Sequence, residues 1–161
     1  MKNSLLTIAF LALASLPAVS NAGFMDNLQG SYSVGGKKCK FEATTTMAGT
    51  ATITPNASGA VVNLKVVIAS LTTEIPVGFR NGSGDVKSTK VEGDILPLPV
   101  TRRTVWNTDE VNRKSTITEY EGVGLAKKRG TYTLAEENNG TVTLSLEEKG
   151  GDLVQCTLTR N

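Results

Sequence analysis

Apolar and polar side chains alternate along most of the chain after residue 22. Aliphatic residues, with one cysteine among them, take every second position in the segments 62–68, 142–146 and 154–158. Threonine fills many of the positions between them, and its branched side chain favours the pleated, half-buried surface of a sheet. A period of two with one apolar face is typical of antiparallel strands that cover a core on one side. The pattern therefore predicts an all-β protein.

Turn signals divide these segments at intervals of about ten residues. Asn139-Gly140 favours a tight hairpin, and glycine-rich stretches at 81–84 and 149–152 mark two more turns. Pro97 and Pro99 indicate an edge strand or a connecting segment. We expect an antiparallel up-and-down meander of about eight to ten strands that closes into a soluble barrel, because closure leaves no strand edge unpaired. A β-sandwich is the alternative.

The beginning of the chain has the composition of a signal peptide. Lys2 supplies a positive charge, a mostly apolar stretch follows, and Ser20 and Ala22 put small side chains before the expected cleavage point. The apolar stretch is shorter than the roughly 20 residues of a spanning helix. We therefore expect a signal peptide at 1–22, a single mature barrel domain at 23–161, and export to the bacterial periplasm or medium. We expect no membrane span in the mature chain.

Cys39 and Cys156 are the only cysteines in the sequence. An exported chain meets an oxidising compartment, so we expect them to form a disulfide bond. We further expect this bond to join the first long strand to the last as antiparallel neighbours, the alternative being a bridge between two packed sheets. Facing residues in an antiparallel pair have a constant sum of residue numbers. The expected register therefore sets these residues opposite each other: Lys37 and Leu158, Phe41 and Val154, Gly35 and Arg160.

The two ends of the mature chain carry one family resemblance. Residues 28–34, Leu-Gln-Gly-Ser-Tyr-Ser-Val, resemble the opening of lipocalin-like (calycin) barrels, in which a Gly-x-Trp begins the first strand and closes one end. Gly30 and Tyr32 match this spacing, with tyrosine in place of tryptophan. Arg160 in the last strand takes the place of the basic residue that packs over the ring in that family. The resemblance implies a barrel closed at this end by Gly30, Tyr32 and Arg160.

Composition argues against several classes of function. The 17 basic and 15 acidic residues give a near-neutral chain, without the basic excess of a duplex nucleic-acid binder. Histidine is absent from the sequence, which excludes histidine-dependent triads and histidine-ligated metals. Glu119 and Glu121 share one face of a strand, and a solvated strand face explains such a pair better than catalysis does. We expect no enzyme, no cofactor and no metal site.

The expected function is the binding of a small apolar ligand inside the barrel. The alternative is a protein-interaction module, such as an envelope accessory protein or an inhibitor, that acts through loops near 81–94 or 109–114. A dry cavity of about 300 Å³ or more favours a ligand carrier over an interaction module. The candidate residues for the cavity are the apolar side chains expected to face inward: Phe41, Val62, Leu64, Val66, Trp106, Tyr132 and Leu144.

Overall fold

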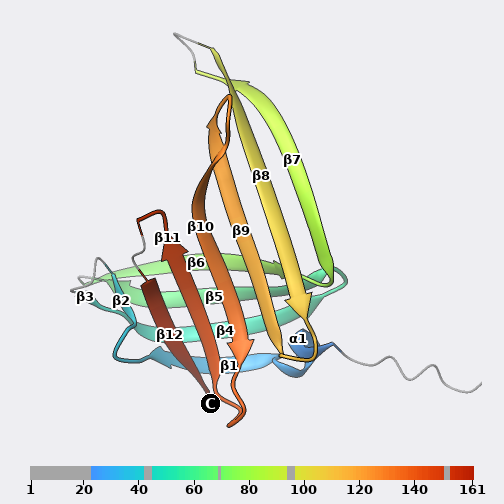
Figure 1. Ribbon diagram of the computed structural model, residues 1–161. Helices are drawn as coiled ribbons and strands as arrows, with labels where there is room; N and C mark the ends of the chain where they lie inside the picture. Colours follow the sequence, from blue (N-terminus) through green and yellow to red (C-terminus); the bar gives the residue numbers. More distant parts are fainter. Residues whose placement is uncertain (1–22, 42–44, 69, 94–96, 151–152) are drawn as a thin grey trace, which may run out of the picture.

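The structure, a computed structural model, describes residues 23–41, 45–68, 70–93, 97–150 and 153–161. The predicted signal peptide lies outside these residues. The described chain is almost entirely strand (Figure 1). Its elements are α1 (Phe24–Asn27), β1 (Gly30–Gly35), β2 (Lys40–Phe41), β3 (Thr45–Thr46), β4 (Ala48–Asn56), β5 (Gly59–Ile68), β6 (Leu71–Arg80), β7 (Ser83–Glu92), β8 (Leu98–Asp109), β9 (Lys114–Val123), β10 (Lys127–Glu136), β11 (Val142–Glu148) and β12 (Leu153–Arg160).

Ten of these strands form one antiparallel sheet in the order β6-β5-β4-β1-β12-β11-β10-β9-β8-β7, and β2 and β3 form a separate short hairpin. Neighbours follow one another along the chain, apart from the pairing of the first strand with the last and that of β1 with β4, which the β2–β3 hairpin separates in the sequence. The predicted all-β antiparallel meander is therefore confirmed. The predicted closure is incomplete, because β6 and β7 lie at the two edges of the sheet and the described residues form no ladder between them.

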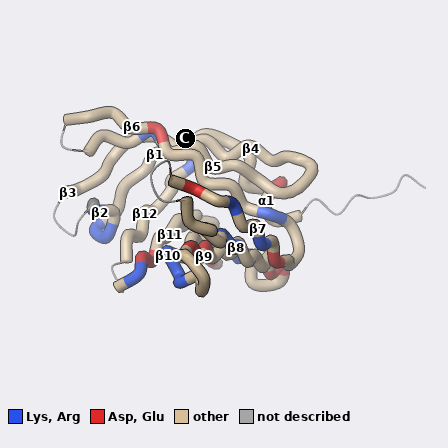
Figure 2. Tube along the Cα trace, turned by 90° about the horizontal axis from the view of Figure 1, so that it is seen from above, with Lys and Arg blue, Asp and Glu red and all other residues tan. Residues whose placement is uncertain are grey.

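The sheet folds over on itself into two facing layers (Figure 2). Strands β1, β4, β5 and β6 form one layer, and β8 to β12 form the other. In Figure 1 the strands of the two layers cross at a steep angle, and β7 to β10 extend well beyond the layer of β4 to β6. We call this the projecting part of the sheet. The opposite end, where α1 and the C-terminus lie, we call the lower end.

The first and last strands are hydrogen-bonded neighbours, as expected, but their register differs from the prediction. Tyr32 faces Arg160, Val34 faces Leu158, and Gly35 faces Thr157. The pairing assumed from the cysteines is wrong because the chain leaves the sheet after Gly35. The partners expected across β1 and β12 are therefore replaced: Leu158 faces Val34 instead of Lys37, Arg160 faces Tyr32 instead of Gly35, and Phe41 pairs with Thr45 instead of Val154.

A turn after β1 brings Cys39 back to β12. Gly36 has a φ of 119°, in the region that favours glycine, and the Cys39 amide donates to the carbonyl of Gly36 at 3.1 Å. The disulfide between Cys39 and Cys156 is present, with 4.4 Å between the two Cα atoms. The amide of Gln155 donates to the carbonyl of Lys38 at 3.1 Å, which holds the turn against β12. The bond thus fastens a turn to the last strand and is not part of a ladder between strands.

The core lies between the two layers and follows the alternation in the sequence. Leu134, Ala60 and Val62 are fully buried, and Leu158 is almost so. Helix α1 was not foreseen from the sequence. It carries buried Phe24 and Met25 beneath the layers at the lower end (Figure 1). No helix in the described part of the chain is long and apolar enough to span a membrane. The apolar face of the strands therefore packs against the opposite layer and against α1.

Candidate functional site

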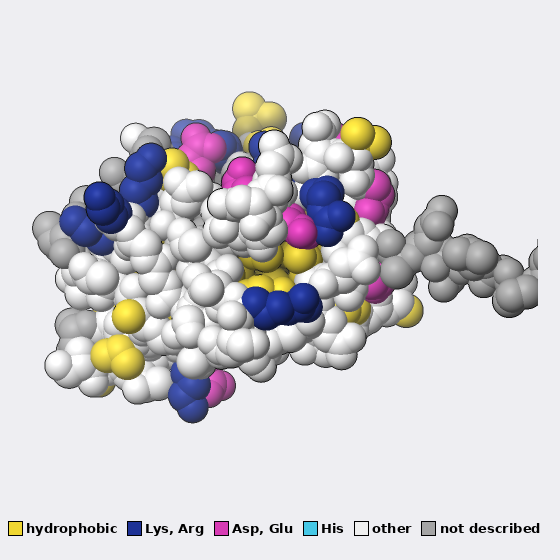
Figure 3. Space-filling model, turned by 90° about the horizontal axis from the view of Figure 1, so that it is seen from below, with side chains coloured by type: hydrophobic (Ala, Val, Ile, Leu, Met, Phe, Trp, Pro, Cys, Tyr) yellow, Lys and Arg dark blue, Asp and Glu magenta, His cyan; other side chains and the backbone are white. Residues whose placement is uncertain are grey.

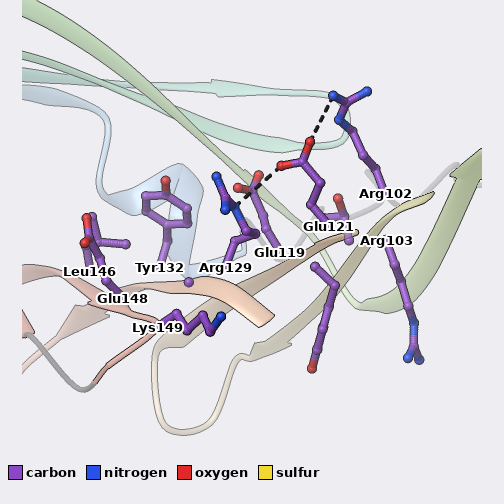
Figure 4. A pocket seen from close by; sticks show the side chains of 12 residues that line it. Arg102, Arg103, Glu119, Glu121, Arg129, Tyr132, Leu146, Glu148 and Lys149 are labelled. Atoms are coloured by element: carbon purple, nitrogen blue, oxygen red, sulfur yellow. Dashed lines mark hydrogen bonds and ion pairs between the residues drawn. The ribbon is translucent and has the colours of Figure 1, made fainter. Parts of the chain in front are cut away.

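A pocket of about 700 Å³ opens on one face of the second layer of the sheet (Figure 4). It is formed by β8, β9, β10 and β11 and by the turn that follows β11. Its lining is mostly charged, unlike the aliphatic cavity that the sequence predicts. The residues that line it are Arg102, Arg103, Thr104, Glu119, Tyr120, Glu121, Arg129, Gly130, Tyr132, Leu146, Glu148 and Lys149.

The register of the strands sets Glu119 and Glu148 on either side of a glycine. Gly130 on β10 faces Glu119 of β9 and Glu148 of β11. Because facing residues in a sheet point to the same side, the two carboxylates stand on the same face, on the two sides of Gly130. Among the described residues, neither forms an ion pair within 4.0 Å with a lysine or arginine. The pocket therefore presents two carboxylates from the strands on either side of Gly130, where Leu146 Cδ1 lies 3.3 Å from the position that a Cβ of residue 130 would take.

Tyr132 and Leu146 form the apolar part of the pocket. They face each other across β10 and β11, two residues further along the strands than Gly130 and Glu148. Burial raises the pKa of the Tyr132 phenol, and the charges of Glu119 and Glu148 raise it further. The phenol therefore stays protonated at neutral pH, where it can donate a hydrogen bond. Its ring lies where the apolar core gives way to the charged pocket.

Arginine side chains hold the third carboxylate of the pocket. Arg102 Nη2 lies 3.0 Å from Glu121 Oε1, and Arg129 Nε lies 3.5 Å from Glu121 Oε2 (Figure 4). Arg102 also pairs with Glu92, and this contact lowers the pKa of the Glu92 carboxyl and raises that of Arg102. These groups are exposed, so solvent screens their attraction. The pairs fix the positions of Glu121 and the two arginines more than they stabilise the fold.

The opposite face of β8 and β9 carries a second concavity, of about 530 Å³. There Arg103 binds Asp85 through two nitrogens and lies 5.5 Å from the centre of the Tyr120 ring. The hydrogen bond from Arg103 lowers the pKa of Asp85. Figure 4 shows Arg103 pointing away from the group around Tyr132. The two concavities therefore open toward different faces of the sheet, and the pocket around Gly130 lies on the inner face.

One of the seven predicted cavity residues, Tyr132, lines the pocket. Val62, Val66 and Leu144 are buried in the packed core, while Leu64 is partly buried against it. None of these four residues lines either concavity.

The two remaining predicted cavity residues are the aromatic side chains Trp106 and Phe41. Trp106 lies near the turn between β6 and β7, where Arg80 stacks 4.7 Å from the ring centre and the indole donates to the carbonyl of Asn81 at 3.3 Å. The indole leaves room only for glycine at position 84, since an added Cβ there would lie 2.1 Å from the ring. The side chain of Phe41 lies outside the described residues.

Sequence reasoning placed Glu119 and Glu121 on one face, and both line the pocket. It missed Glu148 and Arg129 as partners of that pair. One signal was available for Glu148, which falls in phase with Val142, Leu144 and Leu146 and is the first charged residue on that face. The signal for Arg129 was hidden, because the ladder between β9 and β10 is irregular between Lys128 and Gly130.

The residues expected to close the lower end are in contact. Tyr32 is buried, and its hydroxyl donates to the carbonyl of Leu28 at 2.5 Å. The Arg160 guanidinium lies 5.9 Å from the centre of the Tyr32 ring and donates to the carbonyl of Gln29 at 2.5 Å. A side chain on Gly30 would meet Arg160 Nε at 3.3 Å. Seen from below, apolar atoms at the centre of this end lie between basic and acidic side chains (Figure 3).

No family model matches the chain, and no curated protein is similar to it in sequence.

Proposed function

We propose that the protein is a non-enzymatic binding protein whose site is the pocket around Gly130. The observation that carries this proposal is the pair of carboxylates, Glu119 and Glu148, which face one concavity from both sides of a glycine. The volume of about 700 Å³ lies within the range of small-molecule sites. The ligand is a small organic cation with an apolar part.

The chemistry of the lining supports this class of ligand. Glu119 and Glu148 attract a cation into the concavity, while the arginines of the lining are already paired, Arg102 and Arg129 with Glu121 and Arg103 with Asp85, and Lys149 is the remaining basic residue there. The ring of Tyr132 adds attraction for a cation over its face and, with Leu146, apolar surface for the rest of the ligand. The sequence predicted a wholly apolar ligand. We propose instead a ligand that is apolar at one end only, because the aliphatic residues predicted to line the cavity pack in the core.

Binding fits the arrangement better than catalysis. Glu121 is held by Arg102 and Arg129. Glu119 and Glu148 lie on strands separated by β10 and line the same concavity. Carboxylates in these positions can recognise a charged ligand without taking part in a reaction. The proposal also places the protein in an oxidising compartment, which the disulfide supports and to which the predicted signal peptide at 1–22 would direct it.

The test uses a pair of probes that differ only in charge. Phenylethylamine is a cation at neutral pH, and phenylethanol is its neutral counterpart of similar shape. Calorimetric titration of the protein is expected to show binding of the amine and weaker or no binding of the alcohol. Equal affinity for the two, or binding of the alcohol alone, would contradict the proposed ligand class.

Matched variants connect the binding to the site. Glu148→Gln removes one carboxylate of the pocket, and Glu119→Gln removes the other. Glu147→Gln changes the neighbouring residue on β11, whose side chain faces the other side of the sheet and pairs with Lys128. We expect the first two variants to weaken amine binding about fivefold or more, as for the loss of a charged hydrogen-bond partner. The Glu147 variant is expected to bind as the parent does.

A second function, interaction with another protein, is favoured by the tip of the projecting part. Val91, Val123 and Leu125 are 68%, 55% and 87% exposed there, in a region where β7 is also an unpaired edge. The expectation of a loop at 81–94 is corrected, since Ser83–Glu92 forms strand β7. Charged replacements of Val123 and Leu125 together would abolish capture of a protein partner from the host envelope and leave amine binding unchanged.

A further inference from the structure

The expected start of the mature chain lies in a contact between two distant parts of the fold. The amide of Gly23 donates to Asp26 Oδ2 at 2.9 Å, and the amide of Phe24 donates to Glu110 Oε2 at 2.7 Å. A carbon attached to Gly23 at the Cβ position would lie 3.2 Å from Glu110 Oε1. Two carboxylates, one from α1 and one from the turn after β8, therefore flank the backbone of Gly23.

We infer that cleavage between Ala22 and Gly23 converts this contact into an ion-paired lock. Hydrolysis of that peptide bond consumes one water molecule and leaves a carboxylate on Ala22 and an amine on Gly23. The amine takes up a proton at neutral pH, because an α-amino group has a pKa of about 7.7 to 8.0. A neutral N–H with one hydrogen is thus replaced by a cation with three, at a place where two carboxylates already stand.

The contact with Glu110 distinguishes this arrangement from ordinary helix capping. An acidic residue three positions after the N-cap of a helix often accepts from the backbone of the N-cap, so Asp26 alone would carry no inference. Glu110 lies 86 residues from Phe24 in the sequence and reaches the same backbone from another element. Its carboxylate is held at Gly23 by the fold itself and not by local helix geometry.

The lock ties α1 to the layer that carries the pocket. Phe24, Met25 and Leu28 of this N-terminal segment are all buried, and Glu110 follows β8 directly. Figure 1 shows α1 beneath the ends of β8 and β9. Processing therefore fastens the segment that covers the lower end of the core. This inference concerns assembly of the mature chain and stands apart from ligand binding at the other end of the sheet.

The experiment begins with the full chain, expressed with its leader in a bacterial host and recovered from the periplasm. Intact mass and N-terminal sequencing are expected to show Gly23 as the first residue. The mature protein is then treated with a limiting amount of an acetylating reagent at pH 7. The rate at the α-amino group is measured by peptide mass spectrometry, with lysine side chains in the same sample as the reference.

Glu110→Gln is the decisive variant, because glutamine keeps an oxygen that can accept from the Phe24 amide and removes the charge. We expect its α-amino group to react about two- to fivefold faster than that of the parent, the effect of losing one partly exposed ion pair. Glu74→Gln, which removes a surface carboxylate on β6, is the control and is expected to react at the parent rate. A chain that keeps Ala22 as its first residue moves the amine away from Glu110 and is expected to react fast.

Two results would overturn the inference. One is a mature chain that begins at a residue other than Gly23. The other is an equal acetylation rate in the parent, the Glu110→Gln variant and the chain that keeps Ala22. If Glu110→Gln fails to fold, the comparison of the parent with the Ala22 chain decides alone, because that chain leaves every side chain of the fold in place.

Discussion

The inner face of β9, β10 and β11 belongs to the apolar core at one end and to the charged pocket at the other. On β11 the in-facing residues run Val142, Leu144, Leu146 and then Glu148. Along this face of β11, Val142 and Leu144 are buried, Leu146 is half-buried and Glu148 is exposed. Strand alternation thus decides which side a residue faces, and the extent of the opposite layer decides whether that side is dry.

The difference between the two regions explains why an aliphatic cavity was predicted from the sequence and a charged pocket was not. A period of two is visible along the whole of β9, so Ile117, Glu119 and Glu121 fall on one face by position alone. No local signal marks where the opposite layer ends, because that depends on how the sheet folds over on itself. The sequence therefore predicted a cavity where aliphatic side chains pack against each other in the core. It also predicted that Glu119 and Glu121, on the same strand, belong to a solvated outer face.

The largest expected effect comes from opening the disulfide at the edge of the core. Cys39 and Cys156 are 117 residues apart, so the bond restricts the unfolded chain strongly. Replacing both with alanine should lower the free energy of unfolding by about 4 kcal/mol, measured by urea denaturation without reductant. A loss under about 1 kcal/mol would show that the turn at Cys39 is held by other contacts.

A substitution in each region gives the next comparison. Leu134 is fully buried on the inner face of β10, and Leu125 is 87% exposed on the projecting part. Leu134→Ala should cost about 3 kcal/mol of stability, because it leaves a cavity between the layers. Leu125→Ala should change stability by less than about 0.5 kcal/mol. A similar loss in the free energy of unfolding for the two variants, measured by urea denaturation, would mean that Leu125 is buried against other parts of the protein.

Arg160 tests how the lower end is closed. Its guanidinium lies over the Tyr32 ring and donates to a backbone carbonyl of the N-terminal segment. Arg160→Ala should lower the free energy of unfolding by about 1 to 2 kcal/mol, and Arg160→Lys by less, because lysine keeps the charge without the planar fork. Equal stability of all three proteins in thermal denaturation would show that this contact contributes nothing.

The smallest expected effect is a change in the titration of Tyr132. The charge of Glu148 raises the pKa of this phenol, so Glu148→Gln should move that pKa down toward its ordinary value near 10. The sequence has three tyrosines, so the ring resonances of Tyr132 are followed by nuclear magnetic resonance during an alkaline titration. Glu147→Gln, on the other face, should leave this pKa where it is. An unchanged or higher pKa in the Glu148 variant would place the carboxylate away from the ring.

Much of the fold was predictable, and the site only in part. The alternation and the turns gave the antiparallel meander, and the paired cysteines and the contact of Arg160 with Tyr32 were foreseen from the chain ends. The register of β1 with β12 was not, since two glycines after Val34 let the chain leave the sheet before Cys39. Glu119 and Glu148 come together because each lies opposite Gly130 in a different strand pair. The pattern of one strand does not show how it pairs with its neighbours.

The most direct test of the proposed binding site is an amide chemical-shift map of the protein titrated with phenylethylamine. We expect the largest shifts at Gly130 and its neighbours across the sheet, Glu119 and Glu148, with small shifts at Leu134 and Leu144 in the core. Shifts confined to the core, to the exposed tip around Leu125 or to the lower end would contradict it, as would a spectrum that does not change.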